Sequence, residues 1–356
     1  ELVNDDRVAS RVRFDGPAPA SSQLYFRGPV LTRFDGREWR PSKVAPWGAG
    51  LQTQVAGPAL PYQVVLEPTE FNVLPVLEWT TAIDPASFEG DAPRLMGDMQ
   101  WKVERPLTQR FAFRAVAHAQ IRFGVHPTDP AVAESLLVPS ESNPRTTAWV
   151  NAWLAKDPSL QTLGVDAVVK RLLGQINNSY TYTMTPGTYG DARGFSAIDE
   201  FWLDRREGFC EHFASATVFI LRTLGVPARI VTGYQGADLV LQDGWHVVRQ
   251  QNAHAWVEVW TPERGWWRVD PTAAVAPERV FLDHVAAQPD QHVLAEPLIV
   301  VKAHPARRDL VGADVVVTHR HGPFEILWSS RWEHGRVETG ERVGAVAEGG
   351  RLEWPG

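Results

Sequence analysis

The sequence predicts an α+β protein in which an N-terminal antiparallel β domain precedes a mixed domain of helices and strands. Two observations carry this prediction. Short β-like runs separated by turn residues fill the first third of the chain, and helical periodicity begins only after a stretch rich in Pro, Ser and Asp. We therefore expect a β-rich domain over 1–124, a linker over 125–143, an α+β domain over 144–282, and a C-terminal extension over 283–356 whose structure the pattern does not define.

The composition restricts the classes of function. The chain has 356 residues, 44% of them hydrophobic and 22% charged, as in a globular protein long enough for two domains. Its formal net charge of −7 is opposite in sign to the charge that a nucleic-acid-binding protein needs, so we expect no nucleic-acid partner. No run approaches the roughly 20 apolar residues of a membrane helix, and the first residues do not resemble a signal peptide. Taken alone, the chain is expected to be soluble.

The N-terminal part has the pattern of consecutive strands. Between Ser22 and Ser42, two β-like stretches flank Asp35-Gly36, a dipeptide that tolerates the positive φ angles of tight hairpin turns. Three further runs with partial alternation of apolar and polar residues follow: YQVVLEPTE, MQWKVERPL and QRFAFRAVAHAQIRF. This pattern predicts an antiparallel sheet.

The second part begins with helices. Residues 144–156 and 166–177 have helical periodicity, and the latter places four apolar residues on one face: Val169, Leu172, Leu173 and Ile176. Ser196 is placed to cap a short helix over AIDEFWL. A longer amphipathic helix starts at Cys210 and stops at Gly225. Four runs then predict strands: ARIVTGY, WHVVRQQ, HAWVEVW and WWRVDPT.

Cys210 is the only cysteine of the chain, so it forms no intramolecular disulfide, and it lies at the first turn of the predicted helix. The unpaired backbone N–H groups and the positive end of the helix dipole stabilise a thiolate there, and the thiolate is the nucleophilic form of cysteine. For a lone cysteine taken by itself, a small buried core residue is an equally good interpretation.

A thiol nucleophile needs an imidazole to exchange its proton and a third group to fix that imidazole. The stretch NAHAWVEVWTPERGWWRVDPT supplies both, because His254 opens one predicted strand and Asp270 closes the next. If this hairpin pairs about Pro262, the two side chains lie opposite each other on one face, whereas a one-residue shift puts them on opposite faces. Cys210, His254 and Asp270 are therefore the candidate catalytic residues.

These residues resemble the three blocks of the transglutaminase-like superfamily of papain-type cysteine enzymes, in that family's order of Cys, His and Asp. The blocks are EGFCEHFASATVFILRTLGVPARIVTGYQG, NAHAWVEVW and GWWRVDPT. The upstream sequence is similar to that of the bacterial membrane-anchored TgpA-type transglutaminases, including the segments LYFRGPVLTRFDGREWRPS and YTYTMTPGTYGDARGFSAIDEFWL. The resemblance extends from about Tyr25 to Val280.

The resemblance implies a transglutaminase-like (papain-type) fold for the second domain, with Cys210 as nucleophile, His254 as general base and then acid, and Asp270 as orienting carboxylate. It also implies a periplasmic, extracytoplasmic domain of a protein whose other segments, absent from this chain, cross the inner membrane. The expected reaction is acyl transfer from a glutamine of a protein or peptide to an amine or to water, through a cysteine thioester and without a cofactor. The alternatives are a cysteine protease or amidase with the same triad, and a non-catalytic module that binds a cell-envelope polypeptide.

Other polar residues near these motifs have structural interpretations. His212 follows Cys210 by two positions, about 200° round a helix, so we expect it to face away from the reacting thiol's partner. His246 is a rival base, but no carboxylate motif follows it as Asp270 follows His254. Glu211 is suited to complement the helix dipole.

Two further roles stay open or are excluded. The backbone N–H of Cys210 is a candidate oxyanion donor because it lies at the helix start, but a second donor is not assigned. Tyr180, Tyr182 and Trp202 have suitable polar groups, although packing is the better interpretation of each. No close pair of ligand residues accompanies the three catalytic candidates, so we expect no metal site.

Two segments depart from the TgpA-type pattern. The stretch from Gly236 to Val247 lacks the Asn-Pro expected in that loop, so substrate selection is expected to differ. After about Asp283 the chain no longer resembles the family. There, LIVVKAH and ADVVVTH have the composition of strands, and the last seventeen residues have that of a loose tail.

Overall fold

The structure is a computed structural model, and it forms two compact units, Glu1–Ala295 and Glu296–Gly356, which are described separately. It describes the whole chain except residues 1–4, 44–52, 89–91, 125–129, 191–195, 239, 278–313, 322–323, 334–335, 340–344 and 347–356.

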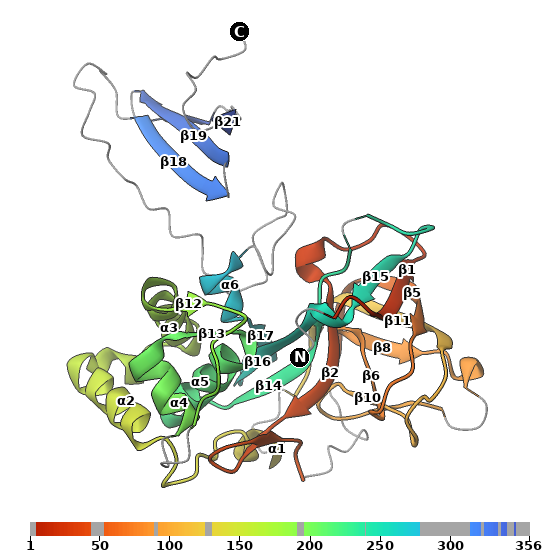
Figure 1. Ribbon diagram of the computed structural model, residues 1–356, viewed down its shortest axis with the longest axis horizontal. Coiled ribbons are helices and arrows are strands. Elements are labelled where there is room, and N and C mark those ends of the chain that lie inside the picture. The colour runs from red at the N-terminus through yellow and green to blue at the C-terminus, as the bar shows by residue number, and fades with distance from the viewer. Residues whose placement is uncertain are drawn as a thin grey trace. The chain divides into compact units, whose positions relative to one another are not determined.

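The N-terminal part of the first unit is built on a five-stranded antiparallel sheet (Figure 1). Its strands, in spatial order, are β15 (His246–Arg249), β1 (Val8–Phe14), β5 (Gln54–Leu66), β11 (Phe111–Arg122) and β8 (Thr80–Ile83). The long strands β5 and β11 pair along almost their whole length, from Phe111 opposite Leu66 to Arg122 opposite Gln54. The antiparallel β region predicted from the sequence is confirmed, and β1 lies before its first predicted strand.

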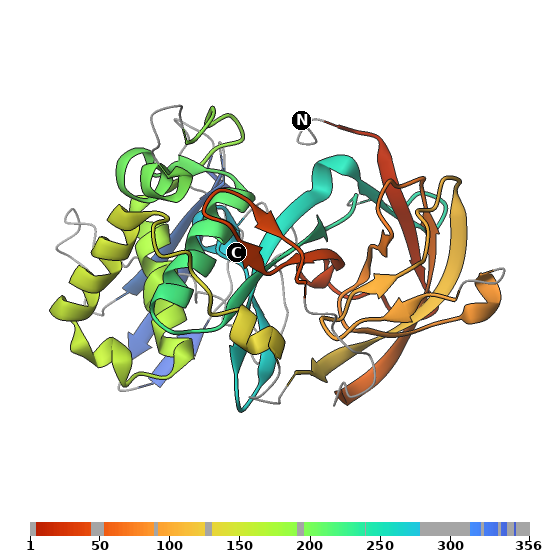
Figure 2. The same cartoon turned by 90° about the horizontal axis from the view of Figure 1, so that it is seen from below.

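Two strands of the N-terminal part complete the sheet of the second part. That sheet has the order β17 (Gly265–Val269), β16 (Ala253–Thr261), β14 (Ala228–Gln235), β2 (Tyr25–Leu31) and β7 (Val76–Leu77). In return, β15 from the second part pairs with β1. Strands far apart in the sequence therefore lie side by side in both sheets (Figure 1 and Figure 2). The predicted division at residues 125–143 stays a prediction for experiments in solution.

Helices cover the second sheet (Figure 1). α2 (Pro144–Lys156) has the bounds that its periodicity predicts, and α3 (Val165–Ser179) slightly exceeds its predicted range. The predicted apolar face of α3 is buried. The helix that begins at Cys210, α5 (Cys210–Thr223), packs against β14 and β16. A short helix, α4 (Ala197–Asp199), continues into a π-helical turn over Glu200–Arg205.

Short elements connect these layers. The hairpin predicted at Asp35-Gly36 is present, since the Asp35 carboxylate accepts the N–H groups of Arg37 and Glu38, and Gly36 has a φ of 104°. The other short strands and α-helices that the structure describes in this unit are β3 (Arg33–Phe34), β4 (Trp39–Arg40), β6 (Val73–Leu74), β9 (Arg94–Leu95), β10 (Trp101–Lys102), α1 (Pro130–Glu134), β12 (Thr181–Tyr182), β13 (Glu207–Gly208) and α6 (Thr272–Val275).

The pairing of β16 and β17 is centred one residue further along the chain than predicted, so the partner of each residue shifts by two positions. Trp260 lies opposite Trp266 and Thr261 opposite Gly265, so the pairing is centred on Glu263 and not on Pro262. The reason is a three-residue loop closed by Gly265, whose φ of 70° only glycine adopts freely. The offset between His254 and Asp270 is thus two positions, which keeps both on one face of the sheet.

The second unit contains four antiparallel strands: β18 (Asp314–His321), β19 (Phe324–Glu333), β20 (Arg336–Thr339) and β21 (Ala345–Val346). β18 confirms the strand predicted from ADVVVTH, and β21 lies in the segment predicted to be a loose tail. The predicted strand LIVVKAH lies outside the described residues.

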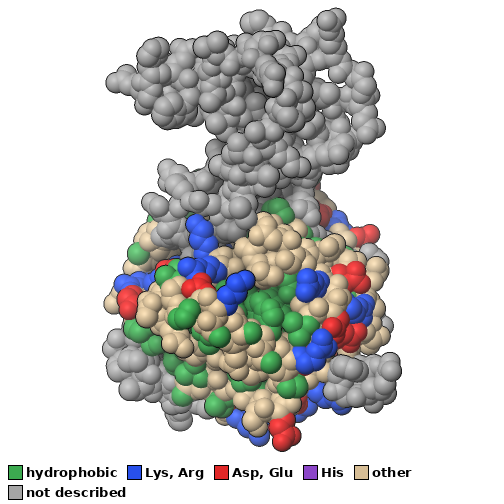
Figure 3. Space-filling model, turned by 90° about the vertical axis from the view of Figure 1, so that its left-hand side faces the viewer, with side chains coloured by type: hydrophobic (Ala, Val, Ile, Leu, Met, Phe, Trp, Pro, Cys, Tyr) green, Lys and Arg blue, Asp and Glu red, His purple; other side chains and the backbone are tan. Residues whose placement is uncertain are grey.

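Two surface properties complete the description. On the face in Figure 3, basic and acidic side chains are mixed with apolar ones, and neither charge sign dominates the part shown in colour. Across the described residues, no helix combines the length and the apolar character that crossing a bilayer requires.

Candidate active site

Cys210 is the first residue of α5, as predicted. The preceding Phe209 has an extended backbone, and its N–H contacts Nδ1 of His212 at 3.4 Å, which closes the start of the helix. The cysteine is 9% exposed and contributes to the wall of a cleft. Its thiol is thus largely shielded from water and lies where the helix presents its unpaired N–H groups.

His254 lies between Cys210 and Asp270. Its Nε2 is 2.7 Å from Oδ2 of Asp270, and Cys210 is near enough to the imidazole to favour its charged form. Because Asp270 occupies Nε2, Nδ1 is the ring nitrogen left for the sulfur. The structure therefore brings together the three residues that the sequence selected.

The charges of the pair His254 and Asp270 are mutually stabilised. Burial opposes a charged imidazole, but the Asp270 carboxylate outweighs it, and the pKa of His254 is raised to about 10. Burial likewise opposes the carboxylate, yet His254 and its hydrogen bond hold the pKa of Asp270 below its usual value. At neutral pH the pair is thus an imidazolium and a carboxylate.

Asp270 accepts two further hydrogen bonds that the sequence did not reveal. The backbone N–H of Thr272 donates to Oδ1 at 2.9 Å, and the hydroxyl of Tyr25 donates to Oδ2 at 2.8 Å. Tyr25 belongs to β2, which enters this sheet from the N-terminal part. The available signal was a tyrosine and an arginine, Tyr25 and Arg27, two positions apart in an otherwise apolar strand. Such residues need buried polar partners.

The cleft has a volume of about 950 Å³ and takes its walls from both parts of the first unit. Thr69 and Phe71 come from the N-terminal part, and Tyr189 comes from the second. At Gly233, which also lines the cleft, a Cβ atom would lie 2.0 Å from the carbonyl oxygen of Phe26. Glycine is therefore required there for β14 and β2 to approach each other.

The two other histidines near the motifs pack against aromatic rings. His246 is on β15 in the N-terminal sheet, with its ring 5.6 Å from that of Phe14, and it does not line the cleft. His212 does line the cleft, but its ring packs against Tyr189 and Phe209. Burial lowers the pKa of His212 to about 4, with help from Arg205, so its imidazole is neutral at physiological pH.

The three aromatic residues considered as second oxyanion donors belong to the core and not to the lining of the cleft. The hydroxyl of Tyr180 donates to the carbonyl oxygen of Trp202 at 2.8 Å, and the ring of Tyr182 stacks on that of Phe213. A second donor is still unassigned. Glu211 lies in the first turn of α5 and lines the cleft beside Cys210.

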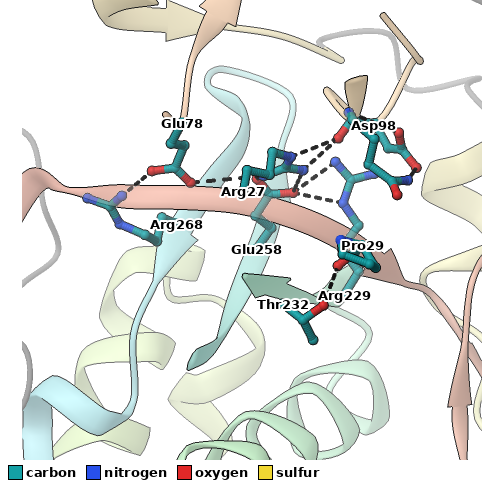
Figure 4. Close-up of polar contacts among 9 residues, drawn as sticks. Arg27, Pro29, Glu78, Asp98, Arg229, Thr232, Glu258 and Arg268 are labelled. Atoms are coloured by element: carbon teal, nitrogen blue, oxygen red, sulfur yellow. Dashed lines mark hydrogen bonds and ion pairs between the residues drawn. The ribbon is translucent and has the colours of Figure 1, made fainter. Parts of the chain in front are cut away.

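A buried network of charges lies beside the site (Figure 4). Glu258 of β16 pairs with Arg27 and with Arg229, whose guanidinium is 2.8 Å from the carboxylate. Burial opposes this charge, but the two arginines outweigh it and hold the pKa of Glu258 below its usual value. Glu78 pairs with Arg268 and lies 3.9 Å from Arg27. Both carboxylates thus have structural partners.

A second cavity, of about 720 Å³, lies beside Trp79, Trp266 and Arg268 and does not include Cys210 or His254. No cluster of three or more His, Cys, Asp or Glu side chains suited to a metal ion occurs in the part of the chain that the structure describes.

Comparison with known proteins gives consistent matches. The family "Transglutaminase-like superfamily" matches residues 155–271, and the family "TgpA N-terminal domain" matches residues 1–122. A protein-glutamine gamma-glutamyltransferase of Pseudomonas aeruginosa is 36% identical over 304 residues, which is 84% of this chain and 43% of that protein. The uncharacterized protein YebA of Bacillus subtilis is 39% identical over 79 residues, which is 21% of this chain and 11% of that protein.

The match extends to solved structures. The crystal structure of the periplasmic domain of TgpA from Pseudomonas aeruginosa, bound to ethylmercury, has a TM-score of 0.69 at 36% identity. The alignment covers 79% of this chain and 95% of that one. The chain spans less than half the length of the full Pseudomonas protein. The resemblance and the fold class predicted from the sequence are confirmed, and the chain belongs to the TgpA-type family within the transglutaminase-like superfamily.

Proposed function

We propose that this chain is the catalytic part of a cysteine acyltransferase of the protein-glutamine gamma-glutamyltransferase type. The observation that carries the proposal is the continuous line of contacts from Cys210 through His254 to Asp270 at the wall of a cleft. The relationship to the Pseudomonas transferase supports it. The triad roles are those predicted from the sequence.

In the first half-reaction the Cys210 thiolate attacks the carbonyl carbon of a glutamine side-chain amide. The imidazolium of His254 stabilises the thiolate before attack, and the first-turn N–H of Cys210 is placed to donate to the developing oxyanion. When the tetrahedral intermediate collapses, the C–N bond breaks and the proton on His254 passes to the leaving nitrogen, which departs as ammonia. The product is a thioester on the sulfur and a neutral imidazole.

In the second half-reaction an amine or a water molecule attacks the thioester. Neutral His254 removes a proton from the attacking group, the C–S bond breaks, and the thiolate and imidazolium pair is restored. Asp270 keeps Nδ1 directed at the sulfur and balances the positive charge in both halves. Transamidation and hydrolysis differ only in the acceptor, so water exclusion from the cleft decides between them.

We further propose that the substrates are proteins or peptides and that the chain acts outside the cytoplasm, as part of a longer membrane-anchored protein. The match to a periplasmic domain supports this location, and the relative's greater length supports the presence of further segments. The volume of the cleft, about 950 Å³, is at the upper end of the range for ligand sites, which supports a substrate as large as a short peptide segment.

The decisive experiment is mass spectrometry of the protein incubated with a glutamine peptide and a primary amine. Transamidation adds the amine to the peptide with loss of ammonia, hydrolysis of the side-chain amide converts glutamine to glutamate, and proteolysis shortens the peptide. We expect the first product and none with Cys210→Ala. An inert wild-type protein that still binds the peptide would favour the alternative of a non-catalytic binding module, and peptide cleavage would favour a protease.

A further inference from the structure

Among the described residues, Tyr25 forms the one hydrogen bond to the Asp270 carboxylate that comes from the N-terminal part of the chain. Its hydroxyl donates to Oδ2, the same oxygen that contacts Nε2 of His254. The tyrosine is 2% exposed, so this hydroxyl has no competing access to bulk water. Burial and the negative charge of Asp270 raise the pKa of Tyr25 well above its usual value, so the phenol keeps its proton and stays a hydrogen-bond donor at neutral pH.

The ring that carries this hydroxyl is fixed on two sides. The guanidinium of Arg268 lies 3.7 Å from the ring centre, and Arg268 is itself paired with the buried Glu78 (Figure 4). The indole of Trp256 meets the ring edge-on at 5.2 Å and stacks against the imidazole of His254 at 6.2 Å. The phenol therefore has little freedom to turn away from Asp270.

We propose that Tyr25 is a positioning residue of this site, which fixes the Asp270 carboxylate and through it the orientation and basicity of His254. The inference rests on the proposed function. Tyr25 takes no part in bond making, so it acts on the rate only through the other two residues. A strand from the N-terminal part is then needed for the site to work, because β2 carries the hydroxyl.

The direction of the expected effect follows from the shared oxygen. A donated hydrogen bond withdraws negative charge from Oδ2. The hydroxyl of Tyr25 therefore weakens the electrostatic stabilisation of protonated His254 by Asp270. Without it, the pKa of His254 should rise further. The charged or titratable groups that act on this unit are Cys210, Asp270, Arg268 and Glu78, and Tyr25→Phe leaves all of them in place.

The test compares Tyr25→Phe with Tyr62→Phe in the otherwise unchanged chain. Tyr62 is a matched control because it is fully buried and its hydroxyl contacts Thr80 and the N–H of Leu77, away from the cleft. With a glutamine peptide and an amine, Tyr25→Phe should lower kcat by about tenfold to a hundredfold with little change in KM, as for the loss of a hydrogen bond to a charged group. It should also move the alkaline limb of the kcat profile to higher pH, whereas Tyr62→Phe should do neither.

The outcomes separate the inference from the proposed function. Unchanged kcat and an unmoved alkaline limb in Tyr25→Phe would overturn the inference, as would equal losses in both variants with no shift of the limb, since a merely structural hydroxyl gives that result. If the wild type transfers nothing, the proposed function fails. In that case the positioning role of Tyr25 is tested by the pH dependence of Cys210 alkylation with iodoacetamide. A profile that is shifted in Tyr25→Phe relative to the wild type supports the role, and identical profiles in these two proteins refute it.

Discussion

Asp270 shows how much of the site depends on one carboxylate. It receives hydrogen bonds from the imidazole of His254, the hydroxyl of Tyr25 and the N–H of Thr272, so three donors surround one buried charge. Its charge is also the reason that a buried imidazole is protonated at neutral pH, since burial alone acts in the opposite direction. Removing the charge and keeping the shape is therefore the most informative change at this scale.

Asp270→Asn should leave the fold intact and reduce kcat by about three to four orders of magnitude, because an amide neither balances an imidazolium nor fixes the productive tautomer. The pKa of His254 should fall from about 10, since burial then opposes the charged imidazole and only Cys210 still favours it. Steady-state kinetics and a histidine NMR titration measure the two effects. A variant with near-normal kcat would contradict the assigned role of Asp270.

His254 also predicts a pH dependence of stability. Its pKa in the folded protein is raised above the value of about 6.5 in the unfolded chain, so its contribution is fully present below that pH and is lost as pH rises towards 10. The difference in unfolding free energy between wild type and His254→Gln should therefore shrink over this interval, as measured by urea unfolding. His246→Gln is the control. Burial lowers the pKa of His246, so its difference should change only as pH falls through about 6.5.

At the scale of elements, α5 is fixed at both ends. Its first turn carries Cys210, and near its last turn the buried Arg222 donates to three backbone carbonyls, those of Thr32, Leu137 and Ala228. These acceptors lie after β2, after α1 and at the start of β14. One guanidinium thus connects α5, the helix that carries Cys210, to three separate stretches of chain. Burial lowers the pKa of Arg222 to about 9, which still leaves it charged at neutral pH.

Arg222→Met should lower the unfolding free energy by about 3–5 kcal/mol, because two buried carbonyls and one partly buried carbonyl lose a charged donor at once. Arg145→Met is the matched control. Arg145 also forms two hydrogen bonds, with Asp204, but both side chains are over 40% exposed, so we expect a much smaller loss of unfolding free energy. Urea unfolding with an unchanged m-value measures both. Equal costs would show that Arg222 does not connect these segments.

Elements were predictable where their signal is local. The bounds of α2, the buried face of α3 and the start of α5 at Cys210 follow from helical periodicity and stop signals, which need no knowledge of distant residues. The three candidate site residues followed from their motifs. Tyr25 did not, because its role depends on the pairing of β2 with β14, and no local pattern specifies a partner that distant. The centre of the β16 hairpin was misplaced by one residue because loop length, and not symmetry, sets it.

At the scale of the molecule, the first unit is held together by exchanged strands. β2 and β7 extend the sheet of the second part, and β15 extends the sheet of the first. A chain cut in the predicted linker would leave two fragments that share both sheets. Two separate domains would come apart after such a cut, whereas two parts that exchange strands should stay associated. Cutting the linker therefore tests the two-domain prediction.

Limited proteolysis between Phe123 and Arg145 should give two fragments that elute together in gel filtration under native conditions and separate only in denaturant. The reason is that backbone hydrogen bonds of β2 with β14 and of β1 with β15 cross the cut. Residues 144–282 produced alone should lack a cooperative unfolding transition. Fragments that separate without denaturant, or an isolated second part that folds and reacts, would show that the exchanged strands are dispensable.

The strand exchange also sets an order of events during synthesis. β2 is complete when Leu31 has been made, but its partner β14 begins only at Ala228, and the carboxylate of Asp270 comes later still. A ribosome-bound chain therefore holds an unpaired edge of β2 until the residues of β14 have been made, which favours slow folding. A chain interrupted between residues 210 and 270 contains Cys210 without Asp270, the carboxylate that favours a charged His254. Under the proposed mechanism we expect such truncated products to be unreactive.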